Sequence, residues 1–217
     1  MINSIYVSWR QGKGKSRYLI GFLARNIEGG GFTFEYNINE VIKARLEGFQ
    51  NYPDLPEIGR VYTSNLQTIF TMRLMSKSRP DRDRFLSFWS ADNPNYDWFD
   101  ELGFTQGKLA TDSFEFLADF PVEHGISFVS EAAALTHNKV KNEDIEVNDK
   151  LDFVLDIDNE YDKDAVKLFK NNVNIGFVKR GHNKFFHKVN NEQLDIRVKS
   201  IDRNGNANQI YFTVKIT

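Results

Sequence analysis

The chain has 217 residues, enough for one large domain or two small ones, and its 41% hydrophobic and 27% charged content is typical of a folded protein. It contains no cysteine, which excludes disulfides, thiolate catalysis and cysteine-ligated metal sites. No run approaches the ~20 apolar residues of a membrane span and no signal-peptide pattern opens the chain, so we expect a cytoplasmic protein with no membrane contact.

The first half predicts a small β-meander followed by helices. Strands are expected over 5–10, 17–24 and 32–36, the first two joined by a polar turn that contains two glycines. Asn37 or Asn39 is expected to cap a helix over 40–48, and Pro53 and Pro56 mark an irregular segment. Further helices are expected over 66–74, 79–89 and 98–103, with a strand over 114–117.

The second half changes to short alternating strands. They are expected over 151–157, 165–169, 175–178, 194–199 and 210–216, with turns over 171–174 and 204–208 and a short helix over 183–189. Leu151, Phe153, Leu155 and Ile157 are predicted to lie on one face of the first of these strands. Because closure removes exposed strand edges, we expect a closed or partly open barrel. The predicted class is α+β, with domains over 1–121 and 122–217.

Charge is distributed unevenly along the chain, although the formal net charge is only -2. Residues 176–217 carry eight Lys or Arg against three acids, and residues 1–27 carry Arg10, Lys13, Lys15, Arg17 and Arg25 with no acid. Segregated charge of this kind can form an anion-binding face, or it can be an ordinary solvated surface.

One segment of the second half resembles the HIRAN domain. Asn159-Glu-Tyr161-Asp162, followed by Ala165-Val166, fits that family's Asn-x-Tyr-Asp-x-x-Ala-[Val/Ile] signature, and 175–180 fits its following strand. HIRAN domains occur alone in bacteria and fused to helicase-like remodellers, and members are known or proposed to bind DNA, notably single-stranded ends. The resemblance therefore implies a nucleic-acid-binding module.

The implied contacts combine base stacking, hydrogen bonding and phosphate neutralisation. An exposed Tyr161 offers a stacking face to any base, and Phe177 or Phe128 would add to it. Asn159 and Asp162 would bond the terminal nucleotide. Phosphates would be neutralised by Lys179, Arg180 and Lys184.

A purely structural interpretation of the same segment stays open. Asn159 and Asp162 are common turn residues, and Asp162 could bond the backbone of Asp164 or Ala165. The family's DNA-end-binding members also carry an Arg-aromatic pair shortly after a Gly of their first strand. Here Gly125 leads to Ser127-Phe128, so the Arg is missing. The stretch 131–149 looks like an insertion, and it is acidic after Asn142.

The first half more faintly resembles the N-terminal subdomain of HipA-type kinases. The resemblance rests on 20–23, 32–36, a helix around Phe70, 82–85 and 99–103. The kinase body of that family is missing and no catalytic-loop motif follows, so the resemblance implies contact with a partner protein and no phosphotransfer.

Other chemistry is set aside. Gly14-Lys15-Ser16 fits the end of a phosphate loop, but Trp9 stands where its first Gly belongs, so we expect a basic hairpin tip. His124, His137, His182 and His187 have no metal-ligand spacing, and no catalytic constellation appears. We expect no enzyme activity, cofactor or metal.

Two function classes remain. The first is a nucleic-acid-binding protein for single strands or strand ends, with DNA preferred to RNA. The alternative is a protein–protein interaction or adaptor module of a toxin–antitoxin-like or DNA-processing system, in which the first domain binds a protein partner.

Overall fold

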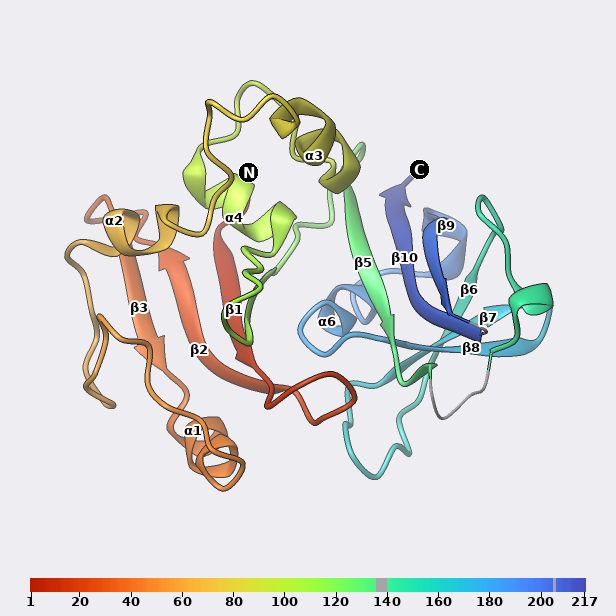
Figure 1. Cartoon of the computed structure of the whole chain (residues 1–217), viewed down its shortest axis with the longest axis horizontal. Helices are drawn as coiled ribbons and strands as arrows, with labels where there is room; N and C mark the ends of the chain where they lie inside the picture. Colours follow the sequence, from red (N-terminus) through yellow and green to blue (C-terminus); the bar gives the residue numbers. More distant parts are fainter. Residues whose placement is uncertain (136–139, 205) are drawn as a thin grey trace. The chain divides into compact units, whose positions relative to one another are not determined.

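The computed structural model describes residues 1–135, 140–204 and 206–217 of the chain. The chain divides into two units, Met1–Phe120 and Pro121–Thr217, each built on its own sheet (Figure 1). The division falls one residue before the predicted boundary. The helices lie mainly in the first unit and the second is mostly strand, so the molecule is α+β, as predicted. Within the described residues, no helix is long and apolar enough to cross a bilayer.

The first unit contains a four-stranded antiparallel sheet with the order β3-β2-β1-β4. The predicted meander forms, and the later strand joins it at β1. Alternate residues such as Ile5, Val7, Leu23 and Phe34 are buried in the core, whereas the later strand is buried on both faces over residues 115–118. The strands are β1 Ser4–Trp9, β2 Tyr18–Arg25, β3 Phe32–Tyr36 and β4 Phe114–Ala118.

Four helices accompany this sheet, with bounds that shift from those predicted. Asn37 caps the first helix, its side chain accepting a hydrogen bond from the Glu40 N–H at 3.3 Å. The third helix begins three residues later than expected, at Arg82, with Asp81 at its N-cap position. The helices are α1 Ile38–Arg45, α2 Leu66–Thr71, α3 Arg82–Trp89 and α4 Trp98–Thr105.

The prediction that Gly103 ends the fourth helix is wrong. It lies inside α4, where a Cβ would approach Ile2 to 2.7 Å and the Ala118 Cβ to 3.0 Å. The glycine is therefore required by close helix–strand packing. The helix instead continues to Thr105, and the capping residue Gln106 adopts a left-handed conformation at φ 63°.

The second unit contains a six-stranded sheet with the order β6-β7-β8-β5-β10-β9. It closes on itself through the segment just before β6. Leu151 donates its N–H to the Ile196 oxygen of β9, and Val198 donates to the oxygen of Asp149. These bonds and an isolated bridge between Lys150 and Arg197 thus join the edges of a six-stranded antiparallel half-barrel, in line with the predicted closed or partly open barrel. The strands are β5 Ser127–Ala133, β6 Asp152–Leu155, β7 Val166–Lys170, β8 Val173–Val178, β9 Leu194–Asn204 and β10 Asn206–Ile216.

Helix α6, Asn183–Phe186, is shorter than predicted and supplies two aromatic side chains to the barrel core. The Phe185 ring lies 5.0 Å from that of Phe128, and the Phe186 ring lies 5.0 Å from that of Phe153. Short 3-10 turns lie at η1 Asn142–Asp144 and η2 Asn191–Gln193.

Two predictions for this unit need correction. Leu155 and Ile157 are 37% and 70% exposed, because β6 ends at Leu155 and the chain leaves the barrel there. The supposed insertion over 131–149 begins inside β5, and its last residues help to close the barrel. Its residues 136–139, with His137, lie outside the described residues, as does Gly205 of the predicted turn.

Candidate nucleic-acid interface

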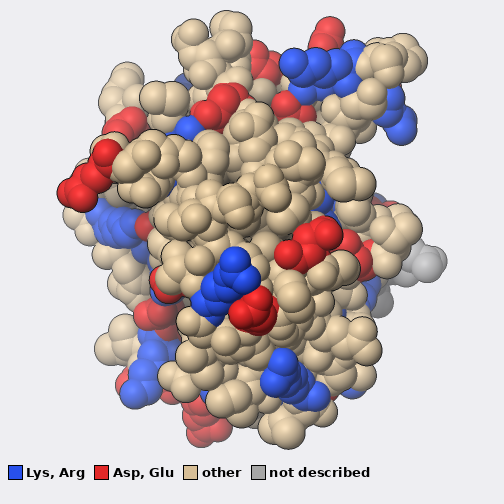
Figure 2. Space-filling view, turned by 90° about the vertical axis from the view of Figure 1, so that its left-hand side faces the viewer, with Lys and Arg blue, Asp and Glu red and all other residues tan. Residues whose placement is uncertain are grey.

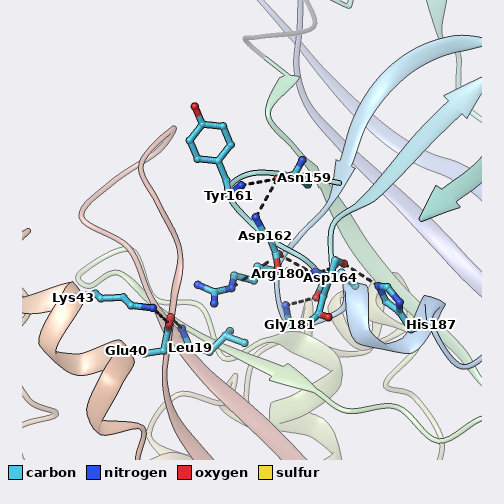
Figure 3. A network of polar contacts seen from close by, with 11 residues as sticks. Leu19, Glu40, Lys43, Asn159, Tyr161, Asp162, Asp164, Arg180, Gly181 and His187 are labelled. Carbon is cyan, nitrogen blue, oxygen red and sulfur yellow. Dashed lines mark hydrogen bonds and ion pairs between the residues drawn. The ribbon is translucent and has the colours of Figure 1, made fainter. Parts of the chain in front are cut away.

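The segment between β6 and β7, residues 156–165, is a turn held by its own side chains (Figure 3). The Asn159 side-chain oxygen accepts hydrogen bonds from the N–H groups of Tyr161 and Asp162, both at 3.0 Å. Its amide nitrogen donates to the Asp156 carboxylate at 2.9 Å. Asn159 therefore fixes the backbone on both sides of Tyr161. We call residues 156–165 the Tyr161 corner.

A buried asparagine ties the Tyr161 corner to the start of α6. Asn183, 1% exposed, donates from Nδ2 to the Asp162 carboxylate at 3.0 Å and to the Asp164 carbonyl at 2.8 Å. Its Oδ1 accepts from the Gly181 N–H at 2.9 Å. Asn183 carries no recognisable pattern in the sequence, because its two partners lie about twenty positions upstream and no spacing rule joins them.

The structural interpretation of Asp162 is confirmed, since its Oδ1 accepts from the Asp164 N–H at 3.1 Å. This bond leaves the carboxylate some capacity to accept more, because each oxygen carries two lone pairs and the side chain is 23% exposed.

Tyr161 itself points away from this network, and its ring projects outward (Figure 3). It is 94% exposed, the most exposed large hydrophobic residue among those described. A rigid turn therefore carries a fully accessible aromatic face, the geometry that base stacking requires.

The electrostatics of the Tyr161 corner are acidic. Five carboxylates, those of Asp156, Asp158, Glu160, Asp162 and Asp164, accompany a single cation, Lys163. The Asn159 amide and the Lys167 ammonium, 2.9 Å from Asp156, lower the pKa of that carboxyl. The Arg180 Nε lies 4.0 Å from Asp162. Acid thus exceeds base at the corner even when Lys167 and Arg180 are included.

Two predicted site residues are buried and do not lie at the surface. Phe128 is fully buried, with its ring 5.6 Å from that of His182, so it is not accessible for stacking on a base. Lys179 is 1% exposed, and its Nζ lies 3.0 Å from the Glu131 carboxylate. The other oxygen of Glu131 accepts from Gln209. Lys179 is therefore a buried structural cation with no access to phosphate. Phe128 and Lys179 are not part of the candidate site.

The remaining predicted residues keep partial exposure. Phe177, on β8, and Lys184, on α6, are half-buried, and the Arg180 side chain is 35% exposed. His187 is exposed, and its Nε2 lies 3.1 Å from the Asp164 carbonyl. The structure thus joins Asn159, Tyr161, Asp162 and Arg180 at one corner. No group of three metal-ligating side chains occurs within the described part of the chain.

Comparison with known proteins gives little beyond this geometry. No family model matches the sequence, and no curated protein matches it. One solved structure, the crystal structure of the HIRAN domain of human HLTF, is similar over 41% of this chain and 74% of that chain, with 17% identity and a TM-score of 0.31. The HipA-type resemblance of the first half gains no support and stays a prediction.

Proposed function

We propose that the second unit binds nucleic acid, without catalysis of its own, by stacking the Tyr161 ring on a base of a single strand or strand end. The observation that carries the proposal is the full exposure of this ring on a turn whose backbone is already fixed. A pre-ordered turn loses little conformational entropy on binding, so more of the stacking energy appears as affinity.

The acidity of the Tyr161 corner determines which part of a nucleic-acid strand can bind there. Internal phosphates are repelled by the unpaired carboxylates of the turn, whereas a sugar hydroxyl can donate a hydrogen bond to Asp162. Arg180 and Lys184, which lie beyond the turn, are the cations proposed for the adjoining phosphates. This division favours a terminal nucleotide, with its free hydroxyl, over an internal one.

The direct test is fluorescence anisotropy of a labelled single-stranded DNA oligonucleotide titrated with the full chain. We expect Tyr161→Ala to weaken binding by about 1–3 kcal/mol and Tyr161→Phe to preserve it, because the phenyl ring keeps the stacking face. Equal affinity of wild type and Tyr161→Ala would remove the ring from the interface.

Two further oligonucleotides test the finer assignment. The same strand with a 3′-phosphate blocks the terminal hydroxyl, and an RNA of the same sequence tests the proposed preference for DNA. Weaker binding of the blocked strand is expected if Asp162 accepts from that hydroxyl. Indifference to the block would exclude the 3′ hydroxyl as the donor to Asp162.

A second candidate function, protein binding, is favoured by the apolar surroundings of the corner. Val154, Leu155 and Ile157 are 53%, 37% and 70% exposed and precede Tyr161 in the chain. With the nearby carboxylates they suit a partner that is both apolar and basic. Millimolar or weaker affinity of the full chain for every oligonucleotide at moderate salt would favour this alternative.

A further inference from the structure

The side chain of Asn183, at the start of α6, has only one possible orientation. Its Nδ2 donates to the Asp162 carboxylate and to the Asp164 carbonyl, and its Oδ1 accepts from the Gly181 N–H. Two of these partners are acceptors and the third is a donor, so a flipped amide would lose all three bonds. Asn183 is also 1% exposed, and little water competes for these bonds.

The backbone just after β8 places Asn183 at this point. Gly181 has φ 107°, a conformation that residues with a side chain rarely adopt. From there its N–H donates to the Asn183 side chain at 2.9 Å, while the Asn183 N–H donates to the Lys179 oxygen at 3.2 Å. Asn183 is therefore held through both its backbone and its side chain.

The Asp162 carboxylate is in turn bonded at both of its oxygens. Its Oδ1 accepts from the Asp164 N–H at 3.1 Å, and its Oδ2 accepts from Asn183 at 3.0 Å. Two bonds at different oxygens fix the plane of the carboxylate, and each oxygen keeps a second lone pair. Because this side chain is 23% exposed, a ligand donor meets an acceptor that is already oriented.

The position of the Tyr161 ring depends on a different asparagine. Asn159 accepts from the N–H groups of Tyr161 and Asp162 and so fixes the backbone that carries the ring (Figure 3). Asn183 has no hydrogen bond to Tyr161, and its bonds lead to Asp162 and Asp164. The aromatic face and the carboxylate of the Tyr161 corner are thus oriented by separate side chains.

We propose that Asn183 is a positioning residue, which orients Asp162 to accept the hydroxyl of a strand terminus and so sets the preference of the site for a free end. The inference rests on the proposed function, because it needs a bound strand. It adds a buried residue without ligand contact as the source of the end preference. A carboxylate that is fixed beforehand loses less conformational entropy on binding than one that rotates freely, so its bond to the hydroxyl contributes more to affinity.

The experiment compares two labelled single DNA strands of one sequence, one ending in a 3′-hydroxyl and the other in a dideoxynucleotide that lacks it. The missing hydroxyl adds no charge, so the ratio of the two dissociation constants measures the hydroxyl alone. By fluorescence anisotropy with the full chain, we expect the hydroxyl strand to bind wild type about tenfold more tightly, the effect of one charged hydrogen bond. Asp162→Ala and Asn183→Ala should each bring the ratio close to one, and the double variant should lower it no further.

Asn191→Ala is the matched control in the same unit. The Asn191 side chain also makes two hydrogen bonds, to the N–H and the oxygen of Phe153 at 3.1 Å and 2.9 Å, but these lead to β6 and not to the Tyr161 corner. Its loss should leave the ratio unchanged. Non-specific binding cancels in the ratio, and on the face in Figure 2 the described Lys and Arg residues lie in small separate groups with acids among them.

A second measurement needs no variant and remains valid if Asn183→Ala does not fold. In the isotope-labelled wild-type chain, the side-chain amide signals of Asn183 should shift saturably with the hydroxyl strand and far less with the dideoxy strand. Equal responses to both strands, or a wild-type ratio preserved in Asn183→Ala, would overturn this inference while leaving stacking by Tyr161 intact. Absence of saturable binding of either strand to wild type would overturn the proposed function and this inference together.

Discussion

Lys179 shows how a residue can satisfy a sequence pattern and still not perform the expected role. It stands in the basic stretch of the second half, yet its ammonium is buried against Glu131. The two residues are 48 positions apart: Glu131 lies on β5, and Lys179 directly follows the last residue of β8. The charge of Lys179 is evident from the sequence, but the strand arrangement that brings a carboxylate to it is not. Phe128 was misassigned for a related reason, because the sequence does not show whether an aromatic residue on a strand faces the core or the solvent.

The first prediction concerns this ion pair. Lys179→Met should lower the free energy of unfolding by about 3 kcal/mol, because removing one partner breaks a buried ion pair. Urea denaturation measures the loss, and Lys215→Met, at an exposed lysine of the same unit, is the control. A variant as stable as wild type would mean that Glu131 is adequately solvated or bonded without the lysine.

At the scale of elements, α4 depends on the charge of its first residues. Asp97 caps the helix and pairs with Arg25 at 2.7 Å. Burial alone would raise the pKa of Asp97, but the Arg25 guanidinium and the N–H groups of Asp100 and Phe99 hold it at about 2. Since this pKa lies below the ordinary value of 3.8, the pairing stabilises the fold above pH 3.8 and is lost as pH falls towards 2.

Asp97→Asn tests that dependence, because asparagine retains the cap but not the charge. We expect the variant to melt below wild type at pH 6 and to converge with it towards pH 2. Thermal unfolding across this range provides the measurement, with Asp54→Asn, at an exposed position of the same unit, for comparison. A gap that stays constant with pH would show that Asp97 acts only as a cap.

The presence and type of the helices and strands were predicted better than the residues at which they begin and end. The strand over 32–36 and the cap at Asn37 followed from local alternation and cap chemistry, both of which are written in neighbouring residues. The Gly103 position was missed because its requirement comes from Ile2 and Ala118, far away in sequence. The residues of the candidate site show the same difference between local and distant requirements. The exposed Tyr161 lies on a predicted turn, whereas Asn183, which fixes that turn from another element, carries no local signal.

At the scale of the whole molecule, each unit has its own sheet and core, and the second sheet closes on itself. We therefore expect residues 121–217 alone to fold, giving dispersed amide resonances and a cooperative thermal transition. A fragment of 152–217 should not fold, because it lacks β5, which lies between β8 and β10, and the segment that joins β9. Collapsed resonances from the longer fragment would show that its barrel needs the first unit.

The bonding of the Tyr161 corner has an evolutionary consequence. Asn159, Asp162 and Asn183 determine the path of the chain there, whereas Asp158, Glu160, Tyr161 and Lys163 lie exposed on that path. The exposed positions can change identity while the three pinning residues preserve the shape. New ligand preferences can therefore arise at this corner through substitution of a few exposed residues, with almost no effect on folding.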